Sequence, residues 1–349
     1  MSIRDGRGLR IASLERADFG RWDTFVLDCP AATFFHRAGW KSVIESAFGH
    51  RCHFLHAERD GRVVGVLPLV HVKSRLFGNS LISTGFTVGG GPVAADDAAL
   101  RMLDARAQAL ADELDVDYLE YRGEAPLHSD WVHNDGLYVD FRKPIGPDPE
   151  KDMLAIPRKQ RAMVRKGIKL GLTSVVDTDV DRLHDVYAVS VRNLGTPVFA
   201  MRYFKSLKNA FGPDADIVTV LHNDLPVASV MNFYFRDQVL PYYGGGTEAA
   251  RPLAANDFMY WEVMRRAVER GFRIFDFGRS KTGTGAYSFK KFWGFTPEPL
   301  VYEYKLRKLK SMPEVNPLNP KYRLFIALWK RLPLPLAGLI GPHIVRNLG

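Results

Sequence analysis

Apolar and polar residues follow two different periods along the chain, and the changes of period predict its elements. Stretches in which apolar residues recur every three or four positions indicate helices with one buried side. Runs rich in β-branched and aromatic residues, separated by Asn223-Asp224 and Arg236-Asp237, indicate strands joined by turns. In the second half of the chain the helices are predicted at 182–191, 203–211, 256–270 and 289–292. The strands are predicted at 172–176, 217–221, 227–235, 239–243, 274–277 and 300–306. The predicted order is therefore β-α-α-β-β-β-α-β-α-β.

The first half of the chain repeats most of this pattern. The matching segments, which occur in the same order in both halves, are 33–49 with 197–212, 89–91 with 244–246, and 109–121 with 265–277. A single match of this kind arises easily by chance, but several in register indicate an internal duplication. We expect a first domain at 1–148, a second at 149–310, and a proline-rich linker with an apolar and basic tail at 311–349.

Composition and charge favour a soluble, cytoplasmic protein with a polyanionic partner. Of the 349 residues, 46% are hydrophobic and 25% are charged, as in ordinary globular proteins. The N-terminal residues lack the apolar core of a signal peptide, and no stretch of about 18 apolar residues could span a membrane. The two cysteines, Cys29 and Cys52, form no disulfide framework, which suits a reducing compartment. The net charge of +9 favours nucleic acid, a nucleotide sugar or an anionic membrane surface.

The element order resembles the GNAT acyltransferase fold, so we expect an α/β protein with two tandem GNAT domains, each with a mixed sheet. In GNAT enzymes a glycine-containing turn before the central helix binds the CoA pyrophosphate through backbone N–H groups. The matching stretch is 251–256, where Ala254 replaces the glycine and Pro252 lacks an N–H. The first domain has Asp96 and Asp97 there, which would repel pyrophosphate. The glycine triplets fall at strand ends, where glycine commonly marks a bulge or turn. We therefore expect CoA to bind poorly.

A duplicated GNAT fold without CoA motifs resembles the FemAB family, whose members transfer an amino acid from aminoacyl-tRNA to an amine of a cell-wall precursor. The residues that carry the resemblance are Asn256, Trp261, Gly271, 275–278 and 289–295, the last similar to the family's Phe-Lys-x-x-Phe-Gly. Trp293 is an extra residue in that motif. The segments 156–167 and 194–204 resemble more specifically the FemAB-related proteins of PEP-CTERM/exosortase and exopolysaccharide loci.

The resemblance implies that Lys290 meets negative charge on the substrate or the transition state, where a fixed cation contributes strongly to catalysis. We expect Phe289 and Phe292 to face inward and Lys291 to face solvent. Asp276 lies in an otherwise apolar strand and must have a partner there. Two hypotheses stay open for it: a general base for an attacking amine, or a carboxylate that fixes Arg279.

Further residues are candidates for substrate binding. Five of them lie at strand ends or at the start of the 256–270 helix: Arg279, Tyr243, Tyr287, Asn256 and Trp261. Aromatic residues near strand ends are, however, more often part of the core. Four more recur at three and four residues and line one helix face: Arg158, Arg161, Arg165 and Lys169. That face could hold a phosphate backbone or a diphosphate, or it could be an ordinary solvated surface, and both interpretations stay open.

We expect neither a metal nor a bound cofactor. His53 and His56 are three residues apart on a predicted strand, so they point to opposite faces and cannot form a metal site with His50 and Cys52. The tail after about residue 311 is apolar with Lys330-Arg331 in its midst, and it either packs onto the body or lies at a membrane interface, on the inner face of the cytoplasmic membrane.

The sequence thus predicts an acyl- or aminoacyltransferase (EC 2.3) that forms an amide on an amine of a cell-envelope glycan or a nucleotide- or lipid-linked precursor. The donor is either aminoacyl-tRNA or acyl-CoA. The alternatives are an acyl-CoA-dependent N- or O-acyltransferase that modifies exopolysaccharide, and a non-catalytic component that binds a glycan precursor.

Overall fold

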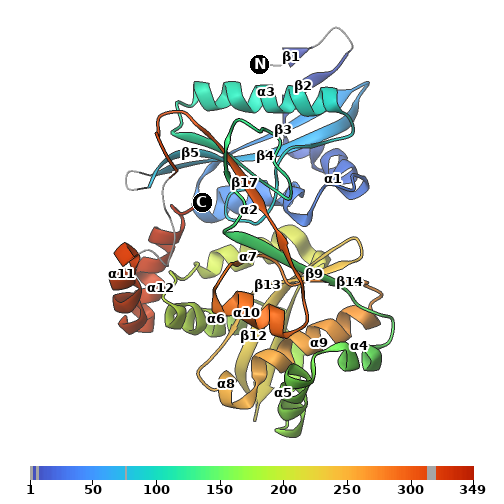
Figure 1. The fold of residues 1–349 in the computed structure, drawn as a ribbon, viewed down its shortest axis with the longest axis vertical. Helices are drawn as coiled ribbons and strands as arrows, with labels where there is room; N and C mark the ends of the chain where they lie inside the picture. Colours follow the sequence, from blue (N-terminus) through green and yellow to red (C-terminus); the bar gives the residue numbers. More distant parts are fainter. Residues whose placement is uncertain (1–2, 5–7, 75–76, 313–319) are drawn as a thin grey trace. The chain divides into compact units, whose positions relative to one another are not determined.

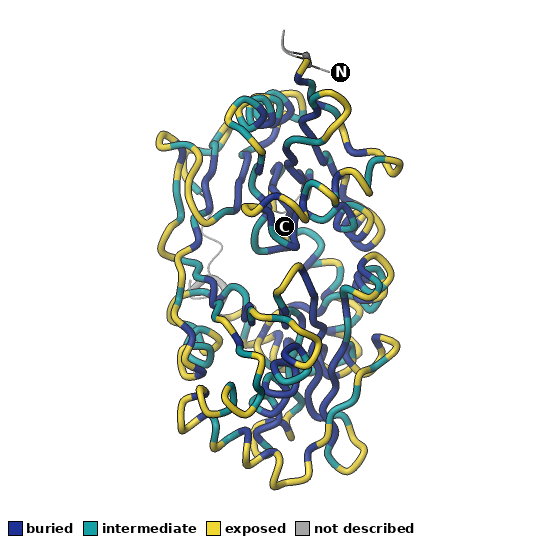
Figure 2. The backbone as a smooth tube through the Cα atoms, turned by 90° about the vertical axis from the view of Figure 1, so that its right-hand side faces the viewer, coloured by how far each residue is buried: buried dark blue, intermediate teal, exposed yellow. Residues whose placement is uncertain are grey.

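The computed structural model describes residues 3–4, 8–74, 77–312 and 320–349, and the chain forms two compact units. The first unit contains the residues up to Gly136, a segment that begins at Leu300, and Arg346–Gly349. The second contains Leu137–Pro299 and the C-terminal helices up to Val345. Residues 313–319, which make up most of the expected proline-rich linker, lie outside the described part of the chain. In both units the strands are mostly buried and the hairpin turns exposed (Figure 2).

The first unit is built on one mixed sheet. Its strands, in spatial order, are β1 (Ile3–Arg4), β2 (Arg10–Ser13), β3 (Arg51–Arg59), β4 (Arg62–Ser74), β5 (Gly78–Ser83), β7 (Tyr118–Gly123), β17 (Val301–Leu306) and β8 (Val132–Asn134), with β6 (Val93–Ala94) beside β4. Its helices are α1 (Phe19–Asp28), α2 (Gly39–Phe48) and α3 (Asp97–Glu113). The parallel pair β5–β7 is joined through α3, whose apolar side packs on the sheet.

The second unit repeats this plan. Its strands, in spatial order, are β10 (Thr173–Val176), β11 (Ala215–His222), β12 (Leu225–Phe235), β13 (Gln238–Gly246), β14 (Ile274–Asp276), β9 (Tyr138–Pro144) and β15 (Ser280–Lys281), with β16 (Pro297–Pro299) also beside β9. Its helices are α4 (Pro149–Ala155), α5 (Arg158–Lys169), α6 (Asp181–Leu194), α7 (Met201–Phe211), α8 (Ala250–Leu253), α9 (Ala255–Glu269), α10 (Gly285–Phe292), α11 (Pro320–Arg331) and α12 (Leu334–Val345). The predicted order from residue 172 to 306 is confirmed, with α8, β15 and β16 as additions.

The division of the chain differs from the expected boundaries at residues 148 and 310. Strand β9, which follows the first unit's elements in sequence, lies in the second sheet between β14 and β15 (Figure 1). Strand β17, at the end of the second repeat, lies in the first sheet beside β7. Sequence repeats mark which segments were duplicated, but they carry no information on which sheet the last strand of each copy joins. The exchange matters for function because β9 brings polar residues into the second unit.

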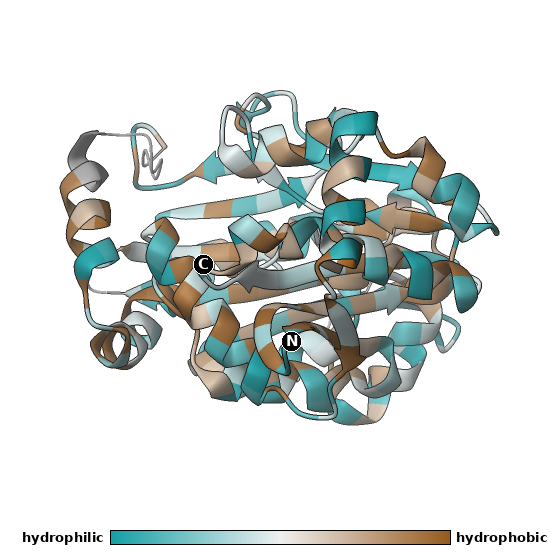
Figure 3. Ribbon diagram, turned by 90° about the horizontal axis from the view of Figure 1, so that it is seen from below, coloured by the Kyte–Doolittle hydropathy of each residue, from teal (hydrophilic) through white to brown (hydrophobic). Residues whose placement is uncertain are grey.

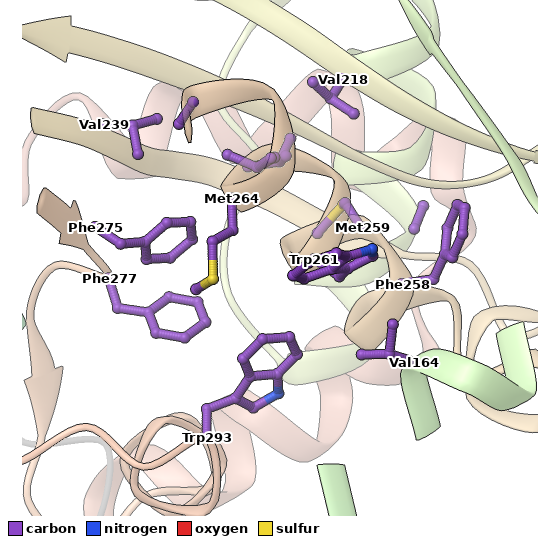
Figure 4. Packing of buried hydrophobic residues seen from close by; sticks show 14 of the residues in the cluster. Val164, Val218, Val239, Phe258, Met259, Trp261, Met264, Phe275, Phe277 and Trp293 are labelled. Atoms are coloured by element: carbon purple, nitrogen blue, oxygen red, sulfur yellow. The ribbon is translucent and has the colours of Figure 1, made fainter. Parts of the chain in front are cut away.

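The core of the second unit is anchored by the residue that departs from the family motif. Trp293 is fully buried, and in Figure 4 its ring points into the cluster that contains Phe277 and Met264. Its indole N–H donates to Asp257 Oδ1 at 3.0 Å, which satisfies the buried donor. Phe292, in contrast, is 57% exposed, so the expectation that it faces inward was wrong. The helix ends at residue 292, and the extra tryptophan takes the inward position.

The C-terminal helices pack against α6 and the loop that follows it. The Trp329 indole N–H donates to the Thr196 carbonyl oxygen at 3.0 Å. The backbone of Gly341 lies against that of Val198 so closely that a Cβ at residue 341 would clash. No helix among the described residues is long and apolar enough to cross a membrane.

We predict that Trp293→Ala lowers the free energy of unfolding by about 3–5 kcal/mol, because it leaves a large cavity and removes a partner of buried Asp257. The adjacent Phe292→Ala should change it by less than about 1 kcal/mol, since most of that ring is in water. Urea unfolding of both variants checks the assignment. Equal destabilisation by the two substitutions would contradict it.

Candidate active site

Two buried carboxyl groups meet where β9 and β14 run side by side. The strands are antiparallel with Asp276 opposite Arg142, and Asp140 lies two residues before Arg142 on the same face. Asp140 is 4% exposed and Asp276 7%. Arg142 donates from Nε to Asp140 Oδ2 at 2.7 Å, and the same nitrogen lies 3.8 Å from Asp276 Oδ2. The guanidinium of Arg142 therefore lies close to both carboxyl groups.

The surroundings of the Asp276 carboxyl group favour its neutral form. Burial raises its pKa well above the ordinary value, and the nearby charge of Asp140 raises it further. The positive charge of Arg142 and the Gly278 N–H, which donates to Asp276 Oδ1 at 2.7 Å, lower this pKa without cancelling the rise. A carboxylic acid that keeps its proton near neutral pH can donate it. The raised pKa of Asp276 favours its neutral acid form, whereas the sequence left two roles open, a general base and a carboxylate that fixes Arg279.

The second carboxyl oxygen of Asp140 could accept a further hydrogen bond. Asp140 Oδ1 is buried and has no hydrogen-bond partner within the described residues. Buried acceptors of this kind are rare in native proteins and call for an explanation. An N–H donor on a bound substrate would supply the missing partner.

Lys290 places its ammonium group at the same strand ends. Its Nζ donates to the carbonyl oxygens of Gly278 at 2.7 Å and Arg279 at 3.0 Å. The rings of Phe141 and Phe277 have their centroids 5.6 and 5.8 Å from Nζ. Burial lowers the pKa of Lys290 from 10.5 to about 8. An ammonium has three N–H donors, so the group can bind a third acceptor while keeping both carbonyls.

Two further cations lie along β15. The guanidinium carbon of Arg279 is 4.4 Å, and Nζ of Lys281 5.5 Å, from the centroid of the Tyr138 ring. Burial, followed by the charge of Arg279, lowers the pKa of Lys281 to about 8. Together with Arg142 and Lys290 they give β9 and the segment after β14 an excess of positive charge, which suits a negatively charged ligand or transition state.

In the first unit the corresponding acid forms an ion pair with an arginine of its own strand. Glu120 is the counterpart of Asp276 in the repeat, and Arg122 the counterpart of Gly278. Arg122 Nε donates to Glu120 Oε1 at 2.6 Å, and both side chains are buried. The acid of the first unit therefore has its own arginine. In the second unit a glycine takes that place, and Asp276 has to share Arg142 with Asp140.

Sequence reasoning identified Lys290, Asp276 and Arg279 but missed Tyr138, Asp140 and Arg142. A signal was present, because residues 138–142 read Tyr-Val-Asp-Phe-Arg, with polar residues on one face of a strand and apolar residues on the other. That strand was assigned to the first domain, so its polar face was not connected with Asp276. Lys291 is exposed, as expected.

The other predicted substrate-binding residues lie apart from this cluster or in the core. Tyr243 is buried among aromatic rings, and its hydroxyl group lies 2.6 Å from that of Tyr203. Trp261 is 6% exposed and belongs to the core cluster, which leaves little of its ring for a ligand. Tyr287 is half-buried, with its ring 5.6 Å from that of Phe141 and thus close to Lys290. Asn256, at the start of α9, has a buried Oδ1 without a partner among the described residues.

The start of α9 does not reproduce a CoA-binding turn. Gly244–Gly246 are part of strand β13, where a Cβ at any of them would clash with a neighbouring element, so they serve close packing. Ala254 adopts a left-handed conformation with φ of 56° immediately before the helix. Asp257 lies in the first turn, and burial raises its pKa. Its carboxyl group accepts a hydrogen bond from the Trp293 indole.

Helix α5 presents a basic face to solvent. Its buried positions are Gln160, Val164 and Gly167, and the last lies against Phe258 of α9. The basic residues lie outside this stripe: Arg158, Lys159, Arg161, Arg165, Lys166 and Lys169. Arg161 donates to the Leu154 carbonyl oxygen at 2.9 Å. Of the ion pairs found in the described part of the chain, none involves these six side chains.

In the described residues no group of three or more His, Cys, Asp or Glu side chains is placed to hold a metal ion.

Comparison with known proteins agrees with this architecture. Residues 158–291 match the family model described as an acetyltransferase (GNAT) domain. No curated protein matches the sequence. Among solved structures, a crystal structure of FemX superposes with a TM-score of 0.65 at 15% identity, covering 90% of this chain and 99% of FemX. A tandem GNAT protein from the clavulanic acid biosynthesis pathway gives 0.55 at 14% identity, covering 87% and 100%. The fold is a tandem GNAT fold.

A third similar structure is the C-terminal domain of a putative lysylphosphatidylglycerol synthetase from Agrobacterium fabrum. It gives a TM-score of 0.58 at 14% identity, covering 82% of this chain and 91% of that domain. At these identities the similarity establishes the fold. The expected α/β class with two tandem GNAT units is thereby confirmed.

We predict that the buried ammonium of Lys290 gives folding stability a distinct pH dependence. The pKa is about 8 in the folded protein and 10.5 in the unfolded chain, so between these values only the unfolded chain holds the proton. Stability from this group therefore rises with pH across that window. The wild-type protein should gain free energy of unfolding relative to Lys290→Met between pH 8 and 10, measured by urea unfolding. Lys291→Met is the control, and a constant difference between wild type and Lys290→Met would refute the prediction.

Proposed function

We propose that the protein is a FemAB-like transferase that moves an aminoacyl or acyl group from an activated ester to an amine of a cell-envelope glycan or lipid-linked precursor, at the inner face of the cytoplasmic membrane. The observation that carries the proposal is the cluster of Asp140, Asp276 and Lys290 in the second unit. It combines a neutral carboxylic acid, a carboxylate with an open oxygen, and a buried cation.

These groups match the needs of amide formation from an ester. The amine nitrogen forms a bond to the ester carbonyl carbon, and the carbon–oxygen bond to the donor's hydroxyl group breaks. The proton lost by the amine passes to the Asp140 carboxylate, whose Oδ1 is the open acceptor. The proton needed by the departing alkoxide comes from Asp276. The pair thus takes up one proton and gives up one, and its total charge is unchanged after a turnover.

Lys290 has two tasks in this scheme. Its ammonium fixes the carbonyls of Gly278 and Arg279, and its third donor stabilises the oxyanion that forms on the ester carbonyl. A fixed cation in a dry site is effective because it need not reorganise during the reaction. The lowered pKa of about 8 leaves Lys290 charged at neutral pH.

Aminoacyl-tRNA is the proposed donor. Six basic side chains on α5, five of them exposed and none with an ion-pair partner among the described residues, suit a phosphate backbone. Asp257 at the start of α9 and Ala254 before it disfavour the CoA pyrophosphate. Three of the similar structures carry names that refer to FemX or to lysylphosphatidylglycerol synthesis. The assignment to PEP-CTERM/exosortase and exopolysaccharide loci rests on the segments 156–167 and 194–204 alone.

A second candidate is an acyl-CoA-dependent N- or O-acyltransferase. It is favoured by the match of residues 158–291 to an acetyltransferase domain model. The third hypothesis, a non-catalytic precursor-binding component, accounts for neither the neutral Asp276 nor the buried Lys290.

We predict that Lys290→Ala lowers turnover by about 10²–10³, as the loss of one oxyanion donor does elsewhere. Lys291→Ala, one residue away on an exposed position, should stay within about twofold of wild type. Lys290→Arg should recover only part of the activity, because the guanidinium is larger and its charge is spread. The assay follows radiolabel from an aminoacyl-tRNA pool, or from acetyl-CoA, into amine-bearing glycan and lipid-linked precursors.

The same assay separates the hypotheses. Reversing Arg158 and Arg165 to Glu should weaken transfer from aminoacyl-tRNA and spare transfer from acetyl-CoA. Transfer from acetyl-CoA alone would establish the second candidate. Wild-type turnover in both alanine variants would remove Lys290 from the site, and no transfer from either donor would favour the non-catalytic hypothesis.

A further inference from the structure

The two C-terminal helices expose an unusual amount of apolar surface. Six large apolar side chains between residues 324 and 340 are at least 40% exposed: Leu324, Phe325, Leu328, Leu336, Leu339 and Ile340. Leu324 and Leu339 reach 69% and 66%. Single exposed leucines are ordinary, but a contiguous apolar set on neighbouring helices marks a binding surface. We call these six residues the C-terminal apolar face.

Most of this face is separate from the side by which the helices attach, but the Phe325 ring stacks on buried Trp329 at a centroid distance of 5.5 Å. The attachment uses Trp329 on α11, together with Ala337, Gly341 and Val345 on α12, all of which are buried. At 100° per residue, Leu336, Leu339 and Ile340 fall on the side of α12 opposite Gly341 and Val345. Helix α12 therefore carries apolar residues on the packed side and on the outer side, and Figure 3 shows brown, hydrophobic positions in the helices at its left. The outer side is not needed for packing.

The charge around the face is of one sign. After Glu314 the chain contains no Asp or Glu, whereas it contains Lys321, Arg323, Lys330, Arg331 and Arg346. Lys330 and Arg331, in the last turn of α11, are exposed. The side chains of residues 321 and 323 lie outside the described part of the structure. A second copy of this chain would bring like charges together, which disfavours self-association through the face. An anionic surface is the complementary partner.

The length of the helices sets the mode of binding. Each has 12 residues, which corresponds to about 18 Å at 1.5 Å per residue. The hydrocarbon core of a bilayer is about 30 Å thick, so neither helix can span it. A helix with an apolar face and flanking cations lies in the plane of the interface instead.

We propose that α11 and α12 dock the protein on an anionic lipid surface, with the C-terminal apolar face inserted among the headgroups and Lys330 and Arg331 against lipid phosphates. This inference stands independently of the chemistry at Lys290. It assigns the partner of a surface that the transfer reaction does not use, and it would place the active site of the second unit near lipid-linked substrates.

The test is co-sedimentation of the full-length protein with phosphatidylcholine vesicles that contain or lack phosphatidylglycerol. Binding to the anionic vesicles is expected, together with at least about tenfold weaker binding of Lys330→Glu/Arg331→Glu, since each cation near an anionic surface contributes about fivefold. Leu324→Glu/Leu339→Glu should abolish binding. Leu225→Glu is the matched control, because Leu225 is 68% exposed on the second unit outside the face.

Thermal unfolding of each variant shows whether it is folded, and the charge reversal keeps the test decisive if the double leucine variant is not. Equal binding of wild type to both vesicle types, or wild-type binding by the variants, would overturn the proposal. Self-association without lipid that Leu324→Glu/Leu339→Glu abolishes would overturn it in favour of a second copy as the occupant.

Discussion

Two carboxyl groups, those of Asp140 and Asp276, are buried beside each other with one guanidinium, that of Arg142, between them. Burial, and after it the charge of Asp140, raise the pKa of Asp276 well above the ordinary value, which favours its protonated form. The remaining features of the site follow from this constraint. Lys290 adds a further positive charge, and its ammonium donates to the carbonyl oxygens of Gly278 and Arg279 after β14. The geometry therefore supplies an acid, a base and a cation within one short stretch of sheet.

The duplication explains why the site lies in one unit only. In the first unit Arg122 forms an ion pair with Glu120, donating a hydrogen bond from Nε to Oε1. In the second unit Gly278 replaces that arginine, and β9 contributes Asp140 and Arg142 through the neighbouring strand. The two units thus hold the corresponding acid differently, Glu120 in an ion pair with Arg122 and Asp276 beside Asp140 and Arg142. A fold built from two copies can keep one copy for stability while the other carries the chemistry.

Much of the fold could be predicted from the sequence, because helix and strand periods are local properties. Lys290 and Asp276 were also found, since a charged residue in an apolar segment stands out. The rest depends on tertiary contacts. The exchange of β9 and β17 between sheets leaves no local signal, and Asp140 was therefore missed. Trp293 is buried and Phe292 is exposed, and this difference depends on where α10 ends. The burial of Tyr243 and Trp261 depends on elements that pack from other parts of the chain.

The central claim is that burial, and after it the neighbouring charge of Asp140, raise the pKa of Asp276, and a titration tests this most directly. In protein labelled with carbon-13 at the aspartate side-chain carboxyl carbon, the resonance of Asp276, assigned by its absence in Asp276→Asn, can be followed with pH. The account predicts a pKa well above the ordinary range in the wild-type protein and a lower one in Asp140→Asn, since that change removes the neighbouring charge. An ordinary pKa for Asp276, or one that Asp140→Asn leaves unchanged, would contradict it.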